Sequence, residues 1–463
     1  MKQLLFALAF LFLPLRVHAE LNLELPDLNL PDLGRSVSSF GSSVNSKSKG
    51  LKTLRKFRGS NQVIEDPEIN LWIRSLGNKL MAAAPRSSSP IYFLVSKESS
   101  INAFATQGGV IVVNAGLILQ TKTESELAAV IAHEIAHVTQ HHIERMINNA
   151  NENKLATNAA LIAGIIASSK DPQAGQAIIS GSIAAMAHQQ LSFSREAETE
   201  ADRVGLRILV RAGFNPKGMP NFLSKLEQFS DDRNANVLEY IQSHPLTSKR
   251  VADTQTRARQ FGVFRGKDNI RYLYMREKIR ATSDINKAPP KNTPVSLKPF
   301  VKALKLQHEG NYLKAVSLMK GRRSTTEAIL TAQLYNRLRQ YQQTIQLLAP
   351  LTEIYPEDEA LSIPLARAYI ATSNINSAWN ILNEVNYSEQ TSLEYFEVLQ
   401  EIARLAGRTA NAYYAAANRN IRIGAYKAAA AQLRRAIKSS NSNNKLHEMQ
   451  QQLTLVEALI NKN

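Results

Sequence analysis

The sequence of 463 residues contains no cysteine. This absence excludes disulfide bonds, a thiolate zinc site, a cysteine nucleophile and a lipoprotein-type cysteine at a cleavage point. Any transition metal must therefore be held by histidine and carboxylate side chains. Apolar residues make up 44% of the chain and charged residues 21%, a composition typical of a globular protein. The length predicts about two or three domains.

Long apolar runs are scarce, and the most apolar one lies at the N-terminus. Lys2 precedes an apolar stretch over residues 4–13, and small residues end at Ala19, where signal peptidase would cut. The run is too short to span a bilayer and Pro14 follows it, which favours a cleaved signal peptide over a membrane anchor. We therefore expect export and a periplasmic location.

Acidic residues are also in short supply, 39 against 56 basic ones, which gives a formal charge of +17. In an exported protein this charge favours anionic lipid or acidic protein partners, and we expect no nucleic acid partner. We expect peripheral association with the anionic outer-membrane surface. Residues 402–447 lack Asp and Glu altogether and predict a docking surface, with a merely solvated face as the alternative. Its basic residues are Arg404, Arg408, Arg419, Arg422, Lys427, Arg434, Arg435, Lys438 and Lys445.

The pattern His-Glu-x-x-His lies in the apolar segment from Glu126 to Val138. Apolar residues recur there at three- and four-residue intervals, which predicts a largely buried helix. On that helix His133 and His137 lie one turn apart and point to one place, as the first two ligands of a tetrahedral zinc ion must. Glu134 lies beside them and is the natural general base for a zinc-activated water. We expect one zinc ion per chain.

Two further histidines follow, and the helix is expected to continue through His142. His141 shares a face with His137, but it is eight residues from His133, about 12 Å along the axis at roughly 1.5 Å per residue. That separation is too large for both side chains to reach one ion. His141 and His142 are therefore expected at the surface or behind the ligands.

A second predicted helix, from Phe193 to Gly205, carries alternating acidic residues. Glu198 and Asp202 share one of its faces. Glu198 would supply the third zinc ligand, and Asp202 a carboxylate that orients a ligating histidine.

Together these motifs resemble the HtpX-like zinc metallopeptidases, over about residues 60 to 265. The resemblance includes Asn102-Ala103-Phe104-Ala105 and Gly108-Gly109 before the histidines, and Ser243-His244-Pro245 with Arg250 after the acidic helix. Membrane spans of the prenyl protease branch are missing, so the chain is most similar to the soluble periplasmic branch of BepA type. The resemblance implies zinc on His133, His137 and Glu198, Glu134 as base and Asp202 behind the ligands.

The resemblance also implies a function in the cell envelope: proteolysis of unfolded or misassembled outer-membrane proteins, and help in their assembly beside the β-barrel assembly machinery. The alternative is a chaperone or scaffold whose metal site is mainly structural, although an intact Glu134 favours the enzyme. His244, with Arg250 nearby, would either plug the fourth zinc position or donate to the transition state.

Strands and helices around the motif can also be predicted. A capped helix is expected to begin at Asp66-Pro67 and end before Pro85. Residues 91–95 predict a strand, and residues 102–114 predict two strands joined at Gly108-Gly109. Either an edge strand of this sheet binds an extended peptide, or the two strands are a plain structural hairpin. Residues 155–187 predict a helical hairpin, either packing filler or a lid.

The C-terminal third predicts repeats. Residues 288–299 hold four prolines and predict a stiff linker. Beyond it, four residues recur 34 positions later, which is the tetratricopeptide period: Tyr341, Thr344, Leu348 and Leu351 are matched by Ile375, Ala378, Leu382 and Val385. The spacing of the further signatures is irregular, so an odd helix is expected to be inserted near 392–406.

We therefore expect an α+β zincin-like metalloprotease domain, helical with a small β-sheet, and then an all-α tetratricopeptide solenoid, with a plain helical bundle as the alternative to the solenoid. The expected divisions are a signal peptide at 1–19, an extended leader at 20–60 that becomes helical only near Leu51, a protease domain at 61–265, a connecting helix and linker at 266–299 and a repeat domain at 300–463.

Overall fold

The structure is a computed structural model that describes residues 39–85, 90–148, 193–231, 235–264, 266–283, 293–321, 324–440 and 443–461. Contacts divide the chain into two units, Met1–Ser39 and Phe40–Asn463, and the second unit contains the sheet and nearly all of the described helices. None of the helices described has the length and apolar character to cross a bilayer. The predicted signal peptide and the 155–187 hairpin lie outside the described residues.

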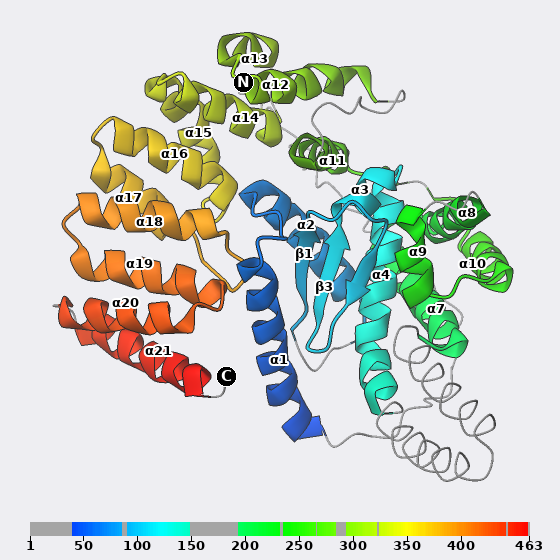
Figure 1. The fold of residues 1–463 in the computed structure, drawn as a ribbon. Helices are drawn as coiled ribbons and strands as arrows, with labels where there is room; N and C mark the ends of the chain where they lie inside the picture. Colours follow the sequence, from blue (N-terminus) through cyan, green and yellow to red (C-terminus); the bar gives the residue numbers. More distant parts are fainter. Residues whose placement is uncertain are drawn as a thin grey trace, which may run out of the picture. The chain divides into compact units, whose positions relative to one another are not determined.

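The N-terminal region combines helices with one small sheet (Figure 1). Its elements are α1 Ser39–Gly59, α2 Pro67–Ala83, β1 Tyr92–Ser96, β2 Ala103–Ala105, β3 Val110–Asn114, α3 Ala115–Gln120, α4 Glu124–Thr139, α7 Arg195–Arg211, α8 Gly218–Asp231, α9 Ala235–Ser243, α10 Ser248–Gln260 and α11 Ile270–Ser283.

The first two helices show one correct prediction and one error. Helix α2 begins as expected, because the Asp66 carboxylate accepts hydrogen bonds from the backbone N–H groups of Glu68 and Ile69. The leader was expected to become helical only near Leu51, but α1 begins at Ser39. Its C-terminal half is anchored by buried side chains such as Leu54. Once such a nucleus exists, each added residue gains a hydrogen bond, so the helix extends into polar sequence.

The sheet has the order β1-β3-β2, with β1 parallel and β2 antiparallel to β3, which confirms the predicted strands. The outer edge of β1 is covered. Ile64 N–H donates to Val95 O at 2.9 Å, and the Gln390 side chain donates to Phe93 O at 2.8 Å. The other edge, β2, lies against α4 and is the edge at which a further strand could pair.

Helices α4 and α7 pack side by side (Figure 1). Thr123 caps α4 and Ser194 caps α7, each accepting a backbone N–H three residues on. The two backbones approach closely at Gly205, where an added Cβ would lie 3.1 Å from the Cα of His133. A glycine at this position therefore lets the acidic face of α7 reach the histidines of α4.

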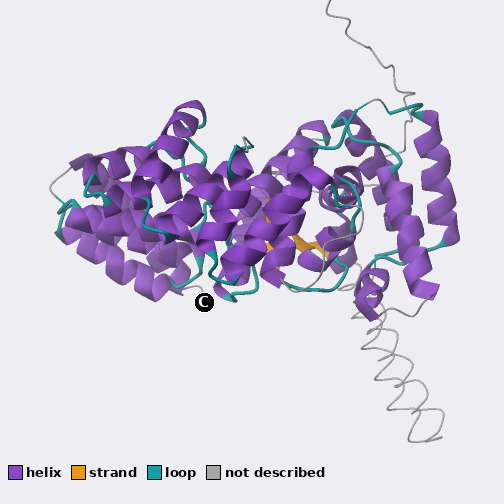
Figure 2. Cartoon of the chain, turned by 90° about the horizontal axis from the view of Figure 1, so that it is seen from above, coloured by secondary structure: helices purple, strands orange, loops and turns teal. Residues whose placement is uncertain are grey.

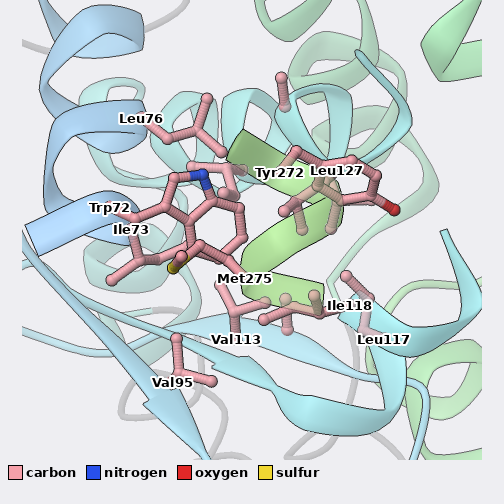
Figure 3. Packing of buried hydrophobic residues seen from close by; sticks show 14 of the residues in the cluster. Trp72, Ile73, Leu76, Val95, Val113, Leu117, Ile118, Leu127, Tyr272 and Met275 are labelled. Atoms are coloured by element: carbon pink, nitrogen blue, oxygen red, sulfur yellow. The ribbon is translucent and has the colours of Figure 1, made fainter. Parts of the chain in front are cut away.

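The core lies between the sheet, α2, α3, α4 and α11, where Trp72, Leu127, Tyr272 and Met275 interlock (Figure 3). The same buried cluster continues into the C-terminal region. Its further members come from α12 to α14 and are Phe300, Ala303, Leu304, Ala315, Val316, Met319, Leu330 and Leu334. One core therefore runs across the boundary predicted near residue 300.

The C-terminal region is helical throughout its described residues, so strand is confined to a small part of the chain (Figure 2). The predicted linker is partly wrong: residues 295–299 form η1 and the start of α12, whose first turn accommodates Pro299 because that position needs no N–H. The elements are η1 Val295–Leu297, α12 Lys298–His308, α13 Tyr312–Met319, α14 Thr325–Arg337, α15 Tyr341–Ile354, α16 Glu359–Ala371, α17 Ile375–Asn383, α18 Leu393–Leu405, α19 Thr409–Arg422, α20 Tyr426–Lys438 and α21 Asn443–Asn461.

Short turns with one left-handed residue mark the repeats. That residue stands two positions before the next helix in each case: Gly310, Arg339, Ser373, Gly407 and Gly424. Thr409 therefore begins a helix 34 residues after Ile375, so α18 and α19 continue the period. The odd helix predicted near 392–406 is α18, an ordinary member of the array. It begins 18 residues after Ile375, as α16 begins 18 residues after Tyr341, and Tyr426 likewise follows Thr409 by 17. The sequence does not show that α19 continues the period, because Thr409 stands where an aromatic or aliphatic residue is expected.

Side-chain hydrogen bonds join the two regions at a set of contacts that we call the junction: Arg58, Glu68, Lys278, Thr326 and Glu389. The ion pair of Lys278 with Glu68 lies within the N-terminal region, and the contacts with Thr326 and Glu389 cross to the C-terminal region. The Lys278 ammonium and the Thr326 hydroxyl each donate to one oxygen of Glu68, the former at 2.9 Å. Arg58 donates to the backbone oxygen of Glu389 at 3.0 Å. A cavity of about 660 Å³ opens beside these contacts, lined by residues that include Lys278, Asn336, Arg337, Arg367 and Glu394.

One member of the basic stretch is not at the surface. Arg422 is buried, its guanidinium lies 4.1 Å from the ring centre of Phe396, and it donates to Ser388 O at 2.8 Å. It belongs to the packing of the repeats, so the predicted docking surface does not include it. Arg404, Lys427, Arg435 and Lys438 are exposed.

Candidate metal centre and active site

Four buried side chains converge on one point between α4, α7 and the end of α9. They are His133, His137, Glu198 and His244, whose ligand atoms all lie within 4.8 Å of one another. The Nε2 atoms of His133 and His137 are 3.0 Å apart. Glu198 places Oε2 3.4 Å from the first of these and Oε1 3.3 Å from the second. The predicted two histidines and glutamate thus meet, and His244 joins them.

Glu134 lies beside this cluster and is fully buried. Its Oε2 accepts a hydrogen bond from the backbone N–H of Ala105 on β2, at 3.0 Å. Its Oε1 has no hydrogen-bond partner among the described residues and lies 3.4 Å from His244 Nε2. The edge strand therefore fixes one carboxylate oxygen and leaves the other facing the cluster.

Asp202 and Arg250 stand behind the ligands. Asp202 Oδ1 lies 3.0 Å from His133 Nδ1. Arg250 donates to both Asp202 oxygens, at 2.7 and 2.9 Å, and lies 2.7 Å from Glu198 Oε2. The guanidinium also donates to Pro245 O at 2.9 Å, which ties the His244 loop to α7. A bidentate arginine therefore orients both carboxylates.

Around His137 the predicted continuation of the helix is wrong, but His141 and His142 lie where they are expected, the first at the surface and the second behind His137. Helix α4 ends at Thr139, and His141 adopts a left-handed φ of 56° before residues 142–148 become helical again. This break sends His141 to solvent and turns the buried His142 toward His137, so their Nδ1 atoms lie 2.8 Å apart. Phe193 stacks on His137 with ring centres 3.9 Å apart.

Burial and neighbouring charges shift the pKa values in opposite directions. Burial raises the pKa of Glu134, which suits a group that must accept a proton. Burial would lower the pKa of His133, but hydrogen bonds to Asp202 and Glu198 outweigh it and raise the pKa to about 10. Burial lowers the pKa of His137. A cation bound here must therefore displace a proton from His133, because only the neutral imidazole can ligate.

Zinc fits these residues. Two buried atoms that face the same point have no hydrogen-bond partner among the described residues: Glu134 Oε1 and His244 Nε2. A cation would satisfy such orphaned acceptors, which are otherwise costly to bury. Nitrogen and carboxylate donors on neighbouring helices are the ligand set of catalytic zinc sites.

The structure brings all seven predicted residues into one site. His133, Glu134 and His137 come from α4, Glu198 and Asp202 from α7, His244 from the end of α9 and Arg250 from α10. The sequence reasoning did not single out Ala105, Phe193 or Glu200. A main-chain donor carries no sequence signal, and Glu200 lies two residues from both Glu198 and Asp202, which puts it on another face of the helix.

The fold and the site define a class, the metallopeptidases whose zinc is held by a His-Glu-x-x-His helix and a later glutamate. Residues 67–258 match peptidase family M48, and residues 337–402 match the tetratricopeptide repeat. The chain is 30% identical over 392 residues to the beta-barrel assembly-enhancing protease of Escherichia coli (strain K12), covering 80% of this chain and 79% of that one.

Two other relatives match shorter segments. The beta-barrel assembly-enhancing protease of Yersinia pestis is 36% identical over 270 residues, 58% of this chain and 55% of that one. The mitochondrial metalloendopeptidase OMA1 of Arabidopsis thaliana is 29% identical over 199 residues, 42% of this chain and 37% of that one. The chain belongs to peptidase family M48: it is a zinc-dependent metalloendopeptidase with C-terminal tetratricopeptide repeats.

Proposed function

We propose that this chain is a periplasmic endopeptidase that removes unfolded or misassembled outer-membrane proteins and assists their assembly, with zinc on His133, His137 and Glu198. The names of the beta-barrel assembly-enhancing proteases, which it resembles over four fifths of its length, support the substrate class. The predicted signal peptide supports the location. The proposed division keeps a protease domain at 61–265 and a repeat domain at 300–463, joined by 266–299.

The observation that carries the enzymatic proposal is the position of Glu134. When bound, zinc lowers the pKa of a water molecule and polarises the scissile carbonyl. Glu134 Oε1 is free to take the proton from that water and to return it to the leaving amine. The hydrogen bond from Ala105 to Oε2 keeps the carboxylate from turning away.

The edge strand β2 supplies a means to hold the substrate. An extended peptide could add to its open edge by main-chain hydrogen bonds, beside the helix that carries Glu134. An unfolded outer-membrane protein offers such extended segments. The cavity next to the junction is lined by charged side chains and by amide side chains such as Asn336. Through these groups the repeat domain would bind substrate or the β-barrel assembly machinery.

His244 and Arg250 serve regulation and positioning in this proposal. His244 Nδ1 lies 3.0 Å from Glu198 Oε1, and its ring is buried against Tyr240. From this position His244 would take the fourth zinc position and would keep water from Glu134. Arg250 holds the His244 loop through Pro245 O and orients Asp202.

The decisive experiment compares two glutamate variants of the full chain in cells and in vitro. Glu134→Gln should lower cleavage of casein on the order of 100- to 10,000-fold with zinc content unchanged, because it removes only the base. The control is Glu239→Gln, an exposed position on α9, which should behave as wild type. If Glu134→Gln loses casein cleavage but fully supports outer-membrane protein assembly, the chain assists assembly as a scaffold, and the proposed contribution of proteolysis to assembly is wrong.

A further inference from the structure

The two histidines of the metal centre have different partners behind them. His133 meets a carboxylate directly, with its Nδ1 3.0 Å from Asp202 Oδ1. His137 meets another histidine, His142, whose Nδ1 lies 2.8 Å from its own Nδ1. His142 Nε2 in turn lies 3.0 Å from Glu200 Oε2, an atom that also accepts from Arg145 at 3.0 Å. No part of the mechanism above uses His142 or Glu200.

The proton positions in this chain follow from the ligand atom. His137 Nε2 faces Glu198 and His133, at 3.3 and 3.0 Å, so it is the nitrogen that a metal would take. A ligating nitrogen carries no proton, and a neutral His137 therefore carries its proton on Nδ1. That N–H must donate to His142 Nδ1, which leaves His142 with its own proton on Nε2, donated to Glu200. Every donor then has one acceptor.

We propose that His142 and Glu200 are positioning residues that hold His137 as the Nδ1–H tautomer, with Nε2 free for the metal. This inference rests on the proposed ligand role of His137. The break in α4 at Gln140 and His141 serves it directly, because a continuous helix would keep His142 on a different face from His137. Glu200 reaches the pair from α7 on the opposite side from Asp202.

Packing alone does not accomplish this. Phe193 stacks on His137 and fixes the plane of its ring. A half-turn about the Cβ–Cγ bond keeps that plane, however, and exchanges the positions of the ring nitrogens with those of the ring carbons. The hydrogen bond to His142 distinguishes the two edges of the ring. Partners of this kind behind a zinc ligand are worth about tenfold to a hundredfold in metal affinity.

The test measures zinc affinity of the full chain by competition with a chelator, using two replacements of His142. His142→Phe fills the space without a hydrogen-bond acceptor and should weaken zinc binding about tenfold to a hundredfold. His142→Gln offers a carbonyl to His137 and an amide to Glu200 and should recover most of the affinity. Glu200→Ala should weaken binding in the same direction. The matched controls, His141→Ala and Glu196→Ala, change exposed neighbours and should match wild type.

A second readout addresses the tautomer itself. The ring nitrogen shifts of ¹⁵N-histidine-labelled zinc protein should report Nδ1–H for His137 in wild type and in His142→Gln. Thermal unfolding of the metal-free variants checks the fold, and if His142→Phe does not fold, the Gln and Glu200→Ala variants carry the test. Wild-type zinc affinity in His142→Phe, or equal losses of affinity in the Phe and Gln variants, would overturn the positioning role of His142.

His137→Ala separates this inference from the proposed ligand set. If that variant keeps its zinc, the ligand assignment itself is wrong. If His137→Ala loses zinc while His142→Phe and Glu200→Ala bind zinc as wild type does, only the positioning role of His142 and Glu200 fails.

Discussion

Two buried glutamates show how the metal centre differs from the junction. Glu68 at the junction is 1% exposed, and Glu134 at the centre is 0% exposed. Both oxygens of Glu68 have donors, from Thr326 and Lys278. Only one oxygen of Glu134 has a donor, and the other faces His244 without a hydrogen bond.

This difference separates a structural charge from a chemical one. A buried carboxylate with every lone pair occupied has nothing left to react with, and its role is to hold two regions together. A buried carboxylate with a free oxygen is kept at a cost in stability, which protein cores rarely tolerate without function. A free oxygen alone does not mark a site, because Glu359 Oε1 in the repeats is also buried without a hydrogen-bond partner. What distinguishes Glu134 is that its free oxygen lies beside the converging side chains of His133, His137, Glu198 and His244.

The largest expected effect is loss of the metal. Purified protein should carry about one zinc per chain, and His133→Ala, His137→Ala and Glu198→Gln should each lose most of it, because each removes a proposed ligand. His141→Ala is the matched control and should keep its zinc, because its side chain is 63% exposed. Metal content is measured by mass spectrometry. Full retention in Glu198→Gln would contradict the third ligand.

His244→Ala tests what fills the space beside the free oxygen of Glu134. Acting as a plug, the imidazole restrains the enzyme, so we expect faster casein cleavage and more self-cleavage in the variant. Acting as a donor to the transition state, its loss would lower the rate on the order of a hundredfold with zinc in place. Initial rates and gel analysis of stored protein distinguish the two. Unchanged rates and autolysis would leave His244 without either role.

At the junction we expect a change in stability with little change in chemistry. Glu68→Gln should lower the free energy of unfolding by on the order of 3 kcal/mol, because it breaks a buried pair with Lys278. Denaturant unfolding measures the loss, and casein cleavage well below the transition should stay near wild type. A large loss of casein cleavage in the folded variant would contradict a purely structural role for Glu68, and its difference from Glu134 would disappear.

The pH dependence at the junction has a definite sign. Burial would lower the pKa of Lys278, but Asp66 and Glu68 outweigh it and raise the pKa above its ordinary value. The stabilisation is therefore complete below the ordinary lysine pKa and is lost only as the pH rises through the higher folded value. Glu68→Gln removes one of the two acidic partners and so reduces this shift. The difference in stability between wild type and the variant should therefore be widest below the ordinary lysine pKa and should narrow at more alkaline pH.

The smallest effect is expected at the basic surface. Reversing Arg404, Lys427, Arg435 and Lys438 to glutamate should weaken binding to vesicles that contain anionic lipid and flatten its salt dependence. The control reverses four exposed lysines near the start of the repeats, Lys298, Lys302, Lys314 and Lys320, and has the same net charge. Equal binding by the two variants would mean that total charge, and not this surface, governs association.

The sequence predicted the site better than it predicted the surroundings of the site. Helical spacing places His133 and His137 on one face of α4, with Glu134 beside them, and it places Glu198 and Asp202 on one face of α7. The two groups meet once these two helices pack. The break after Thr139 could not be predicted, because Gln140 and His141 are compatible with a helix and only the contact of His142 with His137 favours the turn. Tertiary contacts override local preference there.

In the repeats, the period was readable only where its residues are typical. Tyr341 and Ile375 carry the signature at helix starts, but Thr409 does not, although Gly407 makes the same turn before it. The early start of α1 was missed for a related reason. Its first half is polar, and it is helical as a continuation of the part that packs.

The shared core has a consequence for the order in which the chain can fold. A chain synthesised only as far as residue 299 already contains all the residues of the metal centre, but it lacks Phe300, Leu304, Val316 and Leu330, which fill the same hydrophobic interior. Its core remains open until the first helices of the repeats have been made. The region that carries the metal centre therefore completes its core only after α12 to α14 have been synthesised.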